Sequence, residues 1–187
     1  MLKSFFGLYI TYSKYIFKFW VTQITMSAFG LFVSMAAIAS QSIPFIIGSA
    51  IFAIAFFCFL LYDMMFFYGL KKSVQYDERI HFLRKNDGLK IALISYAPTV
   101  LIALLTVLFY IFQAAVPYAI AKGIIIIIHG TYNSTWYLLA DIMAEPLIAI
   151  LILIPGIMSC TLGYYLGLKD MPIRKLLGIP VKPPKNK

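Results

Sequence analysis

Four long apolar segments, separated by short polar stretches, constrain this sequence more than any other feature. They cover residues 20–40, 45–69, 91–112 and 146–168. A helix needs about 20 apolar residues to cross roughly 30 Å of hydrocarbon, because each residue adds about 1.5 Å along the helix axis. Each segment reaches that length. The sequence therefore predicts an all-α fold, a polytopic transmembrane helix bundle with four spans.

The amino-acid composition argues against a soluble globular domain. Hydrophobic residues make up 62% of the 187 residues and charged residues only 12%, whereas a soluble domain is about 45–50% apolar and about 25% charged. A globular core of this size leaves roughly a third of the unfolded chain's surface exposed. The excess apolar surface has to be covered by something other than water, and we expect the lipid bilayer to cover it.

The positions of the basic residues predict the orientation of the chain. Fifteen of the 16 lysines and arginines lie before the first span, between the second and third, or after the fourth, and only Lys122 falls on the opposite side. Basic residues concentrate on the cytoplasmic side of a membrane. Both termini are therefore predicted to be cytoplasmic, in a multi-pass protein of the cell membrane. The net charge of +9 does not indicate nucleic-acid binding, because the charges flank apolar runs and form no basic face.

The two ends of the chain are expected to lie outside the membrane domain of residues 20–168. Along residues 1–19 the lysines share one side of a helix whose other sides are apolar, which predicts an amphipathic helix lying in the membrane interface. A cytoplasmic extension of the first span is the alternative. Residues 169–187 carry six basic residues and four prolines, which is typical of a basic cytoplasmic tail.

The segment between the third and fourth spans, residues 113–145, is harder to interpret. Its apolar run is too short to cross the membrane, and polar residues follow it. We expect an interfacial or re-entrant excursion on the outer face, whose backbone has to be covered by protein or water. Trp136 and Tyr137 are expected to lie at the level of the lipid headgroups.

Asp63 is the acidic residue inside the predicted spans and the candidate intramembrane polar site. A carboxylate in hydrocarbon is costly unless it is paired, hydrated or protonated. Two interpretations remain open. Asp63 could serve a proton, a cation or a protein partner, or it could be a structural carboxylate bonded to a hydroxyl group or to Lys71, Lys72 or Lys90.

Small residues at helical spacing mark candidate helix-packing faces. Gly30 and Ser34 lie four residues apart in the first span, and Ser159, Gly163 and Gly167 continue the same spacing in the fourth. Small residues allow two helix backbones to approach closely within a membrane. The faces are consistent with packing inside one chain and with a homo-oligomer or partner interface.

The sequence contains no pattern that indicates catalysis, a metal site or a cofactor. His81 and His129 are predicted on opposite sides of the membrane and cannot share a metal ion. Cys58 and Cys160 lie inside apolar runs without CxxC spacing. An outer-face hydrolase site containing His129 can be imagined, but no spacing requires it. We therefore expect a protein that is not an enzyme and that holds no metal or cofactor.

Three stretches carry a resemblance to known proteins: Met26–Leu31, Leu89–Ile94 and Leu162–Lys169. Through them the chain resembles a group of uncharacterised small four-span membrane proteins of Gram-positive bacteria. The resemblance implies a four-span fold in a bacterial inner (plasma) membrane. It implies no activity and transfers no functional residue.

Two functions remain as expectations. The first is a non-enzymatic accessory or scaffold subunit of a larger membrane complex. The second is a small oligomeric transporter or channel that uses Asp63 and helix kinks at Pro98 and Pro155. The first predicts that the polar residues of the spans contact neighbouring helices, and the second predicts that they converge on one cavity.

Overall fold

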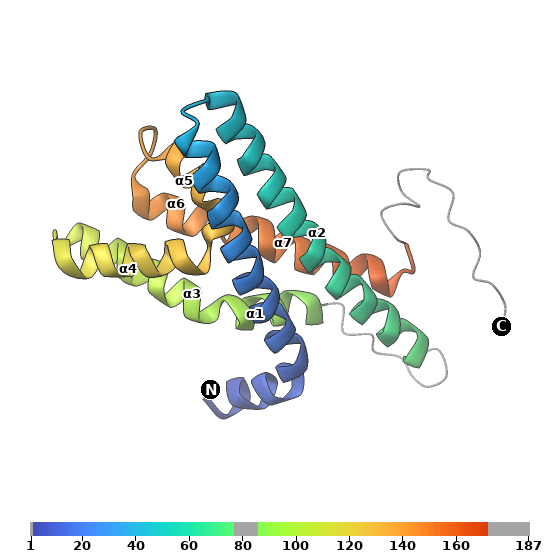
Figure 1. Cartoon of the computed structure of the whole chain (residues 1–187). Helices are drawn as coiled ribbons and strands as arrows, with labels where there is room; N and C mark the ends of the chain where they lie inside the picture. Colours follow the sequence, from blue (N-terminus) through green and yellow to red (C-terminus); the bar gives the residue numbers. More distant parts are fainter. Residues whose placement is uncertain (1, 77–85, 172–187) are drawn as a thin grey trace.

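The computed structural model describes residues 2–76 and 86–171, and this part of the chain is helical throughout, without strands. Figure 1 shows the arrangement of its helices. In chain order they are α1 (Leu2–Ala39), α2 (Ile43–Tyr76), α3 (Asp87–Ile111), α4 (Ala115–Ile128), the 3-10 helix η1 (Gly130–Tyr132), α5 (Asn133–Leu139), α6 (Glu145–Leu151) and α7 (Ile154–Leu168).

Four helical segments of the described chain are long and apolar enough to cross a membrane. They are Tyr12–Ala39, Ile43–Ser73, Asp87–Ile111 and Glu145–Leu168. Each coincides with one of the segments expected from hydropathy, so the prediction of an all-helical fold with four helices long and apolar enough to span a membrane is confirmed. The fourth is interrupted between α6 and α7, immediately before Pro155.

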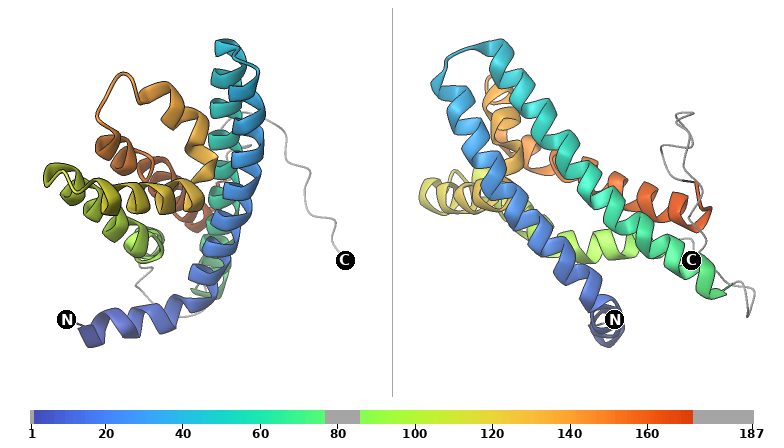
Figure 2. Two further views of the ribbon diagram at one scale, coloured as in Figure 1. Left: turned by 60° about the vertical axis from the view of Figure 1, so that its left-hand side comes forward. Right: turned by 45° about the vertical axis from the view of Figure 1, so that its right-hand side comes forward.

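The N-terminal part of the chain is not a separate helix. Helix α1 runs without a break from Leu2 to Ala39, although its first turns lie at an angle to the remainder (Figure 2). Tyr12, Ile16 and Phe19 are buried in the protein core. The second half of the expected amphipathic helix therefore packs against other helices. The expected tail from residue 172 onward lies outside the described residues.

Helices α2 and α7 lie side by side and form the most extensive contact between helices (Figure 1). A Cβ atom on Gly163 would overlap the backbone carbonyl oxygen of Tyr62, and one on Gly167 would overlap that of Phe66. The two helices therefore approach each other more closely than any larger residue would allow. This face of α7 is used inside the chain.

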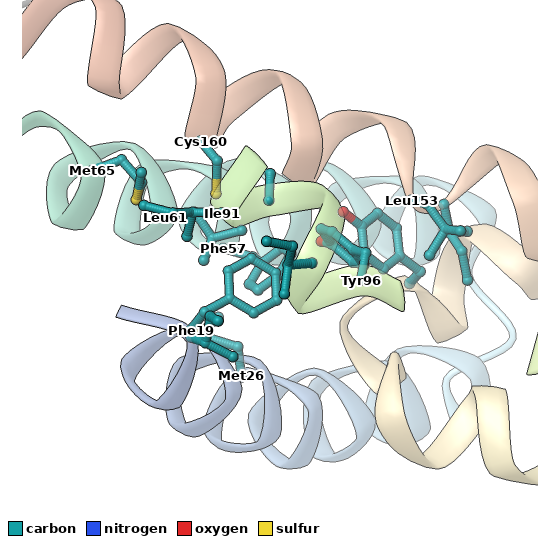
Figure 3. Close-up of a cluster of buried hydrophobic side chains, with 14 of the residues drawn as sticks. Phe19, Met26, Phe57, Leu61, Met65, Ile91, Tyr96, Leu153 and Cys160 are labelled. Atoms are coloured by element: carbon teal, nitrogen blue, oxygen red, sulfur yellow. The ribbon is translucent and has the colours of Figure 1, made fainter. Parts of the chain in front are cut away.

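The hydrophobic core lies where α1, α2, α3 and α7 meet (Figure 3). The ring of Phe19 packs edge-on against the ring of Tyr96, with 4.9 Å between the ring centroids. Phe57 and Cys160 are fully buried in the same cluster. The outer faces of the helices instead expose many large apolar side chains, such as Phe32, which is the expected pattern for a surface covered by lipid.

Candidate functional site

The segment between α3 and α6 contains a sharply bent pair of helices. Helix α4 meets the unit formed by η1 and α5 at an angle of 92°. Gly130, Thr131 and Tyr132, at the break, are buried in the protein. The segment thus reaches the interior of the bundle.

Trp136 was expected to face the lipid headgroups, but its side chain points into the protein. Its side chain is only 5% exposed and belongs to the hydrophobic core, whereas the next residue, Tyr137, is exposed. Helix α5 packs against α1 and α2. Because α5 turns one side toward the bundle, consecutive aromatic residues point in different directions.

Polar side chains of α1 satisfy the backbone groups left free by the break. Ser27 Oγ donates a hydrogen bond to the carbonyl oxygen of Ile127 and accepts one from the N–H group of Gly130 at 2.7 Å. Gln23 Nε2 donates to the carbonyl oxygen of Ile128 at 3.0 Å. A buried backbone group without a partner is costly in an apolar environment. The hydrogen bonds of Gln23 and Ser27 therefore offset the cost of breaking the helix inside the bundle.

The side chain of His129 completes this contact. Gln23 Nε2 lies 2.7 Å from His129 Nδ1. An amide nitrogen can only donate, so Nδ1 accepts and the proton of the neutral imidazole is on Nε2. The imidazole stacks on the ring of Tyr96, with 5.9 Å between centroids and 9° between planes. Tyr132 lies on another side of it, at 6.1 Å.

Several polar atoms around His129 are buried without a hydrogen-bond partner among the described residues. They are His129 Nε2, Gln23 Oε1 and the hydroxyl oxygens of Tyr96 and Tyr132. Their chemistry is that of neutral donors and acceptors, without a carboxylate. Within the described ranges, no three His, Cys, Asp or Glu side chains lie close enough together to hold a metal ion.

The imagined outer-face hydrolase arrangement is not assembled. Ser134 Oγ forms a 2.8 Å hydrogen bond with Ser49 Oγ of α2, and Asp141 is exposed. Glu145 forms an ion pair with Lys122. Each candidate side chain therefore has a separate environment, and no nucleophile and base are brought together.

Gly30 and Ser34 of α1 lie against the same broken segment. The position of a Cβ atom on Gly30 is occupied by the backbone of Thr131, and Asn133 Nδ2 donates to Ser34 Oγ at 2.9 Å. Ser159, the third small residue singled out in the sequence, contacts the thiol of Cys58 on α2.

Sequence reasoning missed the contact between α1 and the break, although a signal was present. Gln23, Ser27, Gly30 and Ser34 follow one another at spacings of four, three and four residues. This spacing places them on one side of a helix. A continuous polar or small stripe on an otherwise apolar span indicates a polar partner inside the protein.

Asp63 lies elsewhere, in a groove of about 510 Å³ between α1 and α2. Lys14, Lys18 and Lys71 line the same groove. A bond between Asp63 and a lysine belonged to one of the two interpretations left open by the sequence, and Asp63 forms no ion pair with the lysines that the structure describes. Asp63 is half-buried and is not part of the contact around His129.

Because Asp63 makes no ion pair in the described chain, we expect Asp63→Asn to leave the fold intact. The free energy of unfolding should change by less than about 0.5 kcal/mol, as for surface substitutions. Denaturant titration of the purified protein in detergent, followed by circular dichroism, measures this change. A loss as large as that of a core substitution would show that Asp63 is structural.

The ion pair of Lys122 and Glu145 joins α4 to the start of α6. Lys122 Nζ lies 2.5 Å from Glu145 Oε1, and both side chains are 29% exposed. The hydroxyl group of Tyr118 donates to the other carboxylate oxygen. A carboxylate that accepts from both a cation and a phenol is held in one orientation.

We expect Lys122→Gln to destabilise the protein by about 1 kcal/mol, the upper end for a partly exposed pair. A double-mutant cycle with Glu145→Gln isolates the pairwise contribution in the same unfolding assay. Lys90→Gln, which removes a lysine without an ion pair in the described chain, is the control. Additive single effects, with no coupling between the two positions, would contradict the prediction.

Comparison of the chain with protein-family models, curated proteins and solved structures finds no match. The resemblance to four-span proteins of Gram-positive bacteria therefore stays an expectation from the sequence.

Proposed function

We propose that the chain is a non-enzymatic accessory or scaffold subunit of a larger membrane complex. The observation that carries this proposal is that the polar residues of the spans form hydrogen bonds within the chain itself. Gln23, Ser27 and Ser34 bind the broken segment of the same chain. Thr106 and Thr161 bond to carbonyl groups of their own helices, at 2.9 and 2.8 Å. None of these five residues lines the groove that contains Asp63. This arrangement favours internal packing over a path for a solute.

The outer surface of α1 and α2 supports the same proposal. Phe29, Phe52 and Phe56 form a cluster with 6.0–6.3 Å between ring centroids, and each of the three side chains is more than one-third exposed. Aromatic clusters offer a large, rigid contact area to a neighbouring helix. We propose this cluster as the contact with a partner, which could be a larger membrane protein or a second copy.

The proposed orientation has both termini in the cytoplasm of a bacterium, with the chain in its inner (plasma) membrane. The lysines at the N-terminal end of α1 and at the C-terminal end of α2 support it, since they cluster on one side of the bundle. In this orientation the bent segment is re-entrant from the outer side. The first turns of α1 would then lie along the cytoplasmic leaflet.

A small oligomeric transporter or channel is the second candidate, and one observation favours it. The break between α4 and η1 lies inside the bundle, and buried polar atoms around it have no partner within the described residues. Broken helices near the middle of a membrane form substrate sites in transporters. In this alternative the solute would pass His129, and Asp63 would act only at the entrance.

Co-purification from the native membrane distinguishes the two candidates. The tagged chain is extracted in a mild detergent, and stoichiometric companions are identified by mass spectrometry. A photo-crosslinking amino acid at Phe52 reports the proposed contact, and one at Met158, which is even more exposed on α7, is the matched control. The accessory function predicts one discrete protein crosslinked from position 52 and none from position 158. A chain that purifies alone and crosslinks only to lipid at both positions would contradict it.

A further inference from the structure

The groove between α1 and α2 has an uneven distribution of charge. Its lining includes three lysines, Lys14 and Lys18 from α1 and Lys71 from α2, together with Asp63. All three lysines are exposed, and none forms an ion pair within the described chain. Three positive charges against one negative charge make the opening attractive to an anion.

Apolar side chains also line the groove. Leu60, Met64 and Phe67 of α2 line it beside Asp63, and Tyr15 and Tyr68 add two aromatic rings. A soluble anion would use the lysines alone and gain nothing from this surface. A phospholipid would use both, because its phosphate group would meet the lysines while its glycerol and upper acyl chains cover the apolar side chains.

The position of the groove along the spans fits such a ligand. It lies beside the beginning of the span in α1 and the end of the span in α2, so it opens at the level where the hydrocarbon region ends. Lysines at this level reach toward headgroups while their methylene stems remain on apolar surface. A chain that crosses a membrane is surrounded by lipid, so a phospholipid ligand would always be present.

We propose that the groove between α1 and α2 is a binding site for an anionic phospholipid with a hydroxylated headgroup, of the phosphatidylglycerol type. Lys14, Lys18 and Lys71 bind the phosphate group. Asp63 accepts a hydrogen bond from a headgroup hydroxyl group, which explains why a carboxylate lies among the lysines. The site does not require a protein partner, so it stands independently of the proposed accessory function.

Native mass spectrometry of the full-length protein tests whether the lysines of the groove bind an anionic lipid. The protein is equilibrated in micelles containing equal amounts of phosphatidylglycerol and phosphatidylcholine with identical acyl chains. We expect it to retain phosphatidylglycerol about tenfold more than phosphatidylcholine. Lys14→Gln/Lys71→Gln should lower this preference at least about fivefold. Lys90→Gln/Lys169→Gln removes the same charge from outside the groove and should leave the preference unchanged. Elution volume and helicity verify that both variants are folded.

Three further comparisons test the role of Asp63 and distinguish the lipid site from an effect of overall charge and from binding of a free anion. Asp63→Ala should reduce the preference for phosphatidylglycerol over phosphatidic acid, which has no headgroup hydroxyl group, and an unchanged ratio would overturn the role of Asp63. An equal loss in the two lysine variants would overturn the site in favour of overall charge. Displacement of the lipid by excess inorganic phosphate would show that the groove takes a free anion, which also overturns the proposal.

Discussion

Gly163→Ala is expected to destabilise the protein by about 2–3 kcal/mol, as overpacking does in a close-packed interface. The added Cβ atom would overlap the carbonyl oxygen of Tyr62 and lie 3.0 Å from its Cα atom. These are backbone atoms of α2, so no side chain can rotate away. The helices have to separate, and every contact along the α2–α7 interface is weakened together.

Gly48→Ala is the matched control for this substitution. Gly48 lies in α2, and nothing lies within 4 Å of the position of its Cβ atom. Alanine is the better helix former, so this variant should be neutral or up to about 1 kcal/mol more stable. Unfolding of both variants by titration with a denaturing detergent, followed by circular dichroism, measures the difference. Equal stability of the two alanine variants would mean that the close approach of α2 and α7 is not present.

Ser27→Ala, combined with Gln23→Leu, should release the broken segment from α1. The pair removes the partners of the Ile127 and Ile128 carbonyl groups and of the Gly130 N–H group. Leaving buried backbone groups unpaired costs about 1–3 kcal/mol for each group, although hydrogen bonds measured in membrane proteins average nearer 0.6 kcal/mol. We expect a total loss of about 3 kcal/mol.

Hydrogen–deuterium exchange locates this effect. In the double variant the amides around the break, residues 127–136, should exchange faster than in the parent protein, while the amides of α2 keep their protection. Thr25→Ala, on the exposed side of α1, is the control and should change neither stability nor exchange. Unchanged exchange around the break in the double variant would contradict the role given to Gln23 and Ser27.

Hydropathy alone was sufficient to locate the four long apolar helices. The span expected over residues 91–112 became α3, Asp87–Ile111, because the apolar run had both the length and the composition that hydrocarbon requires. Pro98 remains inside this helix. Pro155, in contrast, lies next to a helix break. Helix α6 ends before Pro155, and α7 begins at Ile154, so the proline lies in the first turn of α7, where a missing N–H group is harmless.

The contacts of the broken segment could not be predicted from the local sequence pattern. His129 contacts Gln23 across 106 positions of the chain, so only the assembled bundle reveals which backbone groups are satisfied. Trp136 was assigned to the membrane interface because tryptophan is enriched there, and tertiary packing buried it instead. Asp63 stood out in the sequence as a carboxylate in an apolar run, but its surroundings of three lysines depend on how α1 and α2 pack.

If the protein is an accessory subunit, the polar side chains of its spans face protein neighbours and line no aqueous path. Labelling of introduced cysteines with a membrane-impermeant thiol reagent tests this arrangement. Ser95→Cys and Thr99→Cys, at positions at most 2% exposed, are made in a chain whose native Cys58 and Cys160 are replaced by alanine. Ser40→Cys, at the exposed turn between α1 and α2, is the positive control. We expect labelling at position 40 and none at 95 or 99 from either side of the membrane. Labelling at 95 or 99 in the folded protein would reveal a water-filled path and contradict the accessory function.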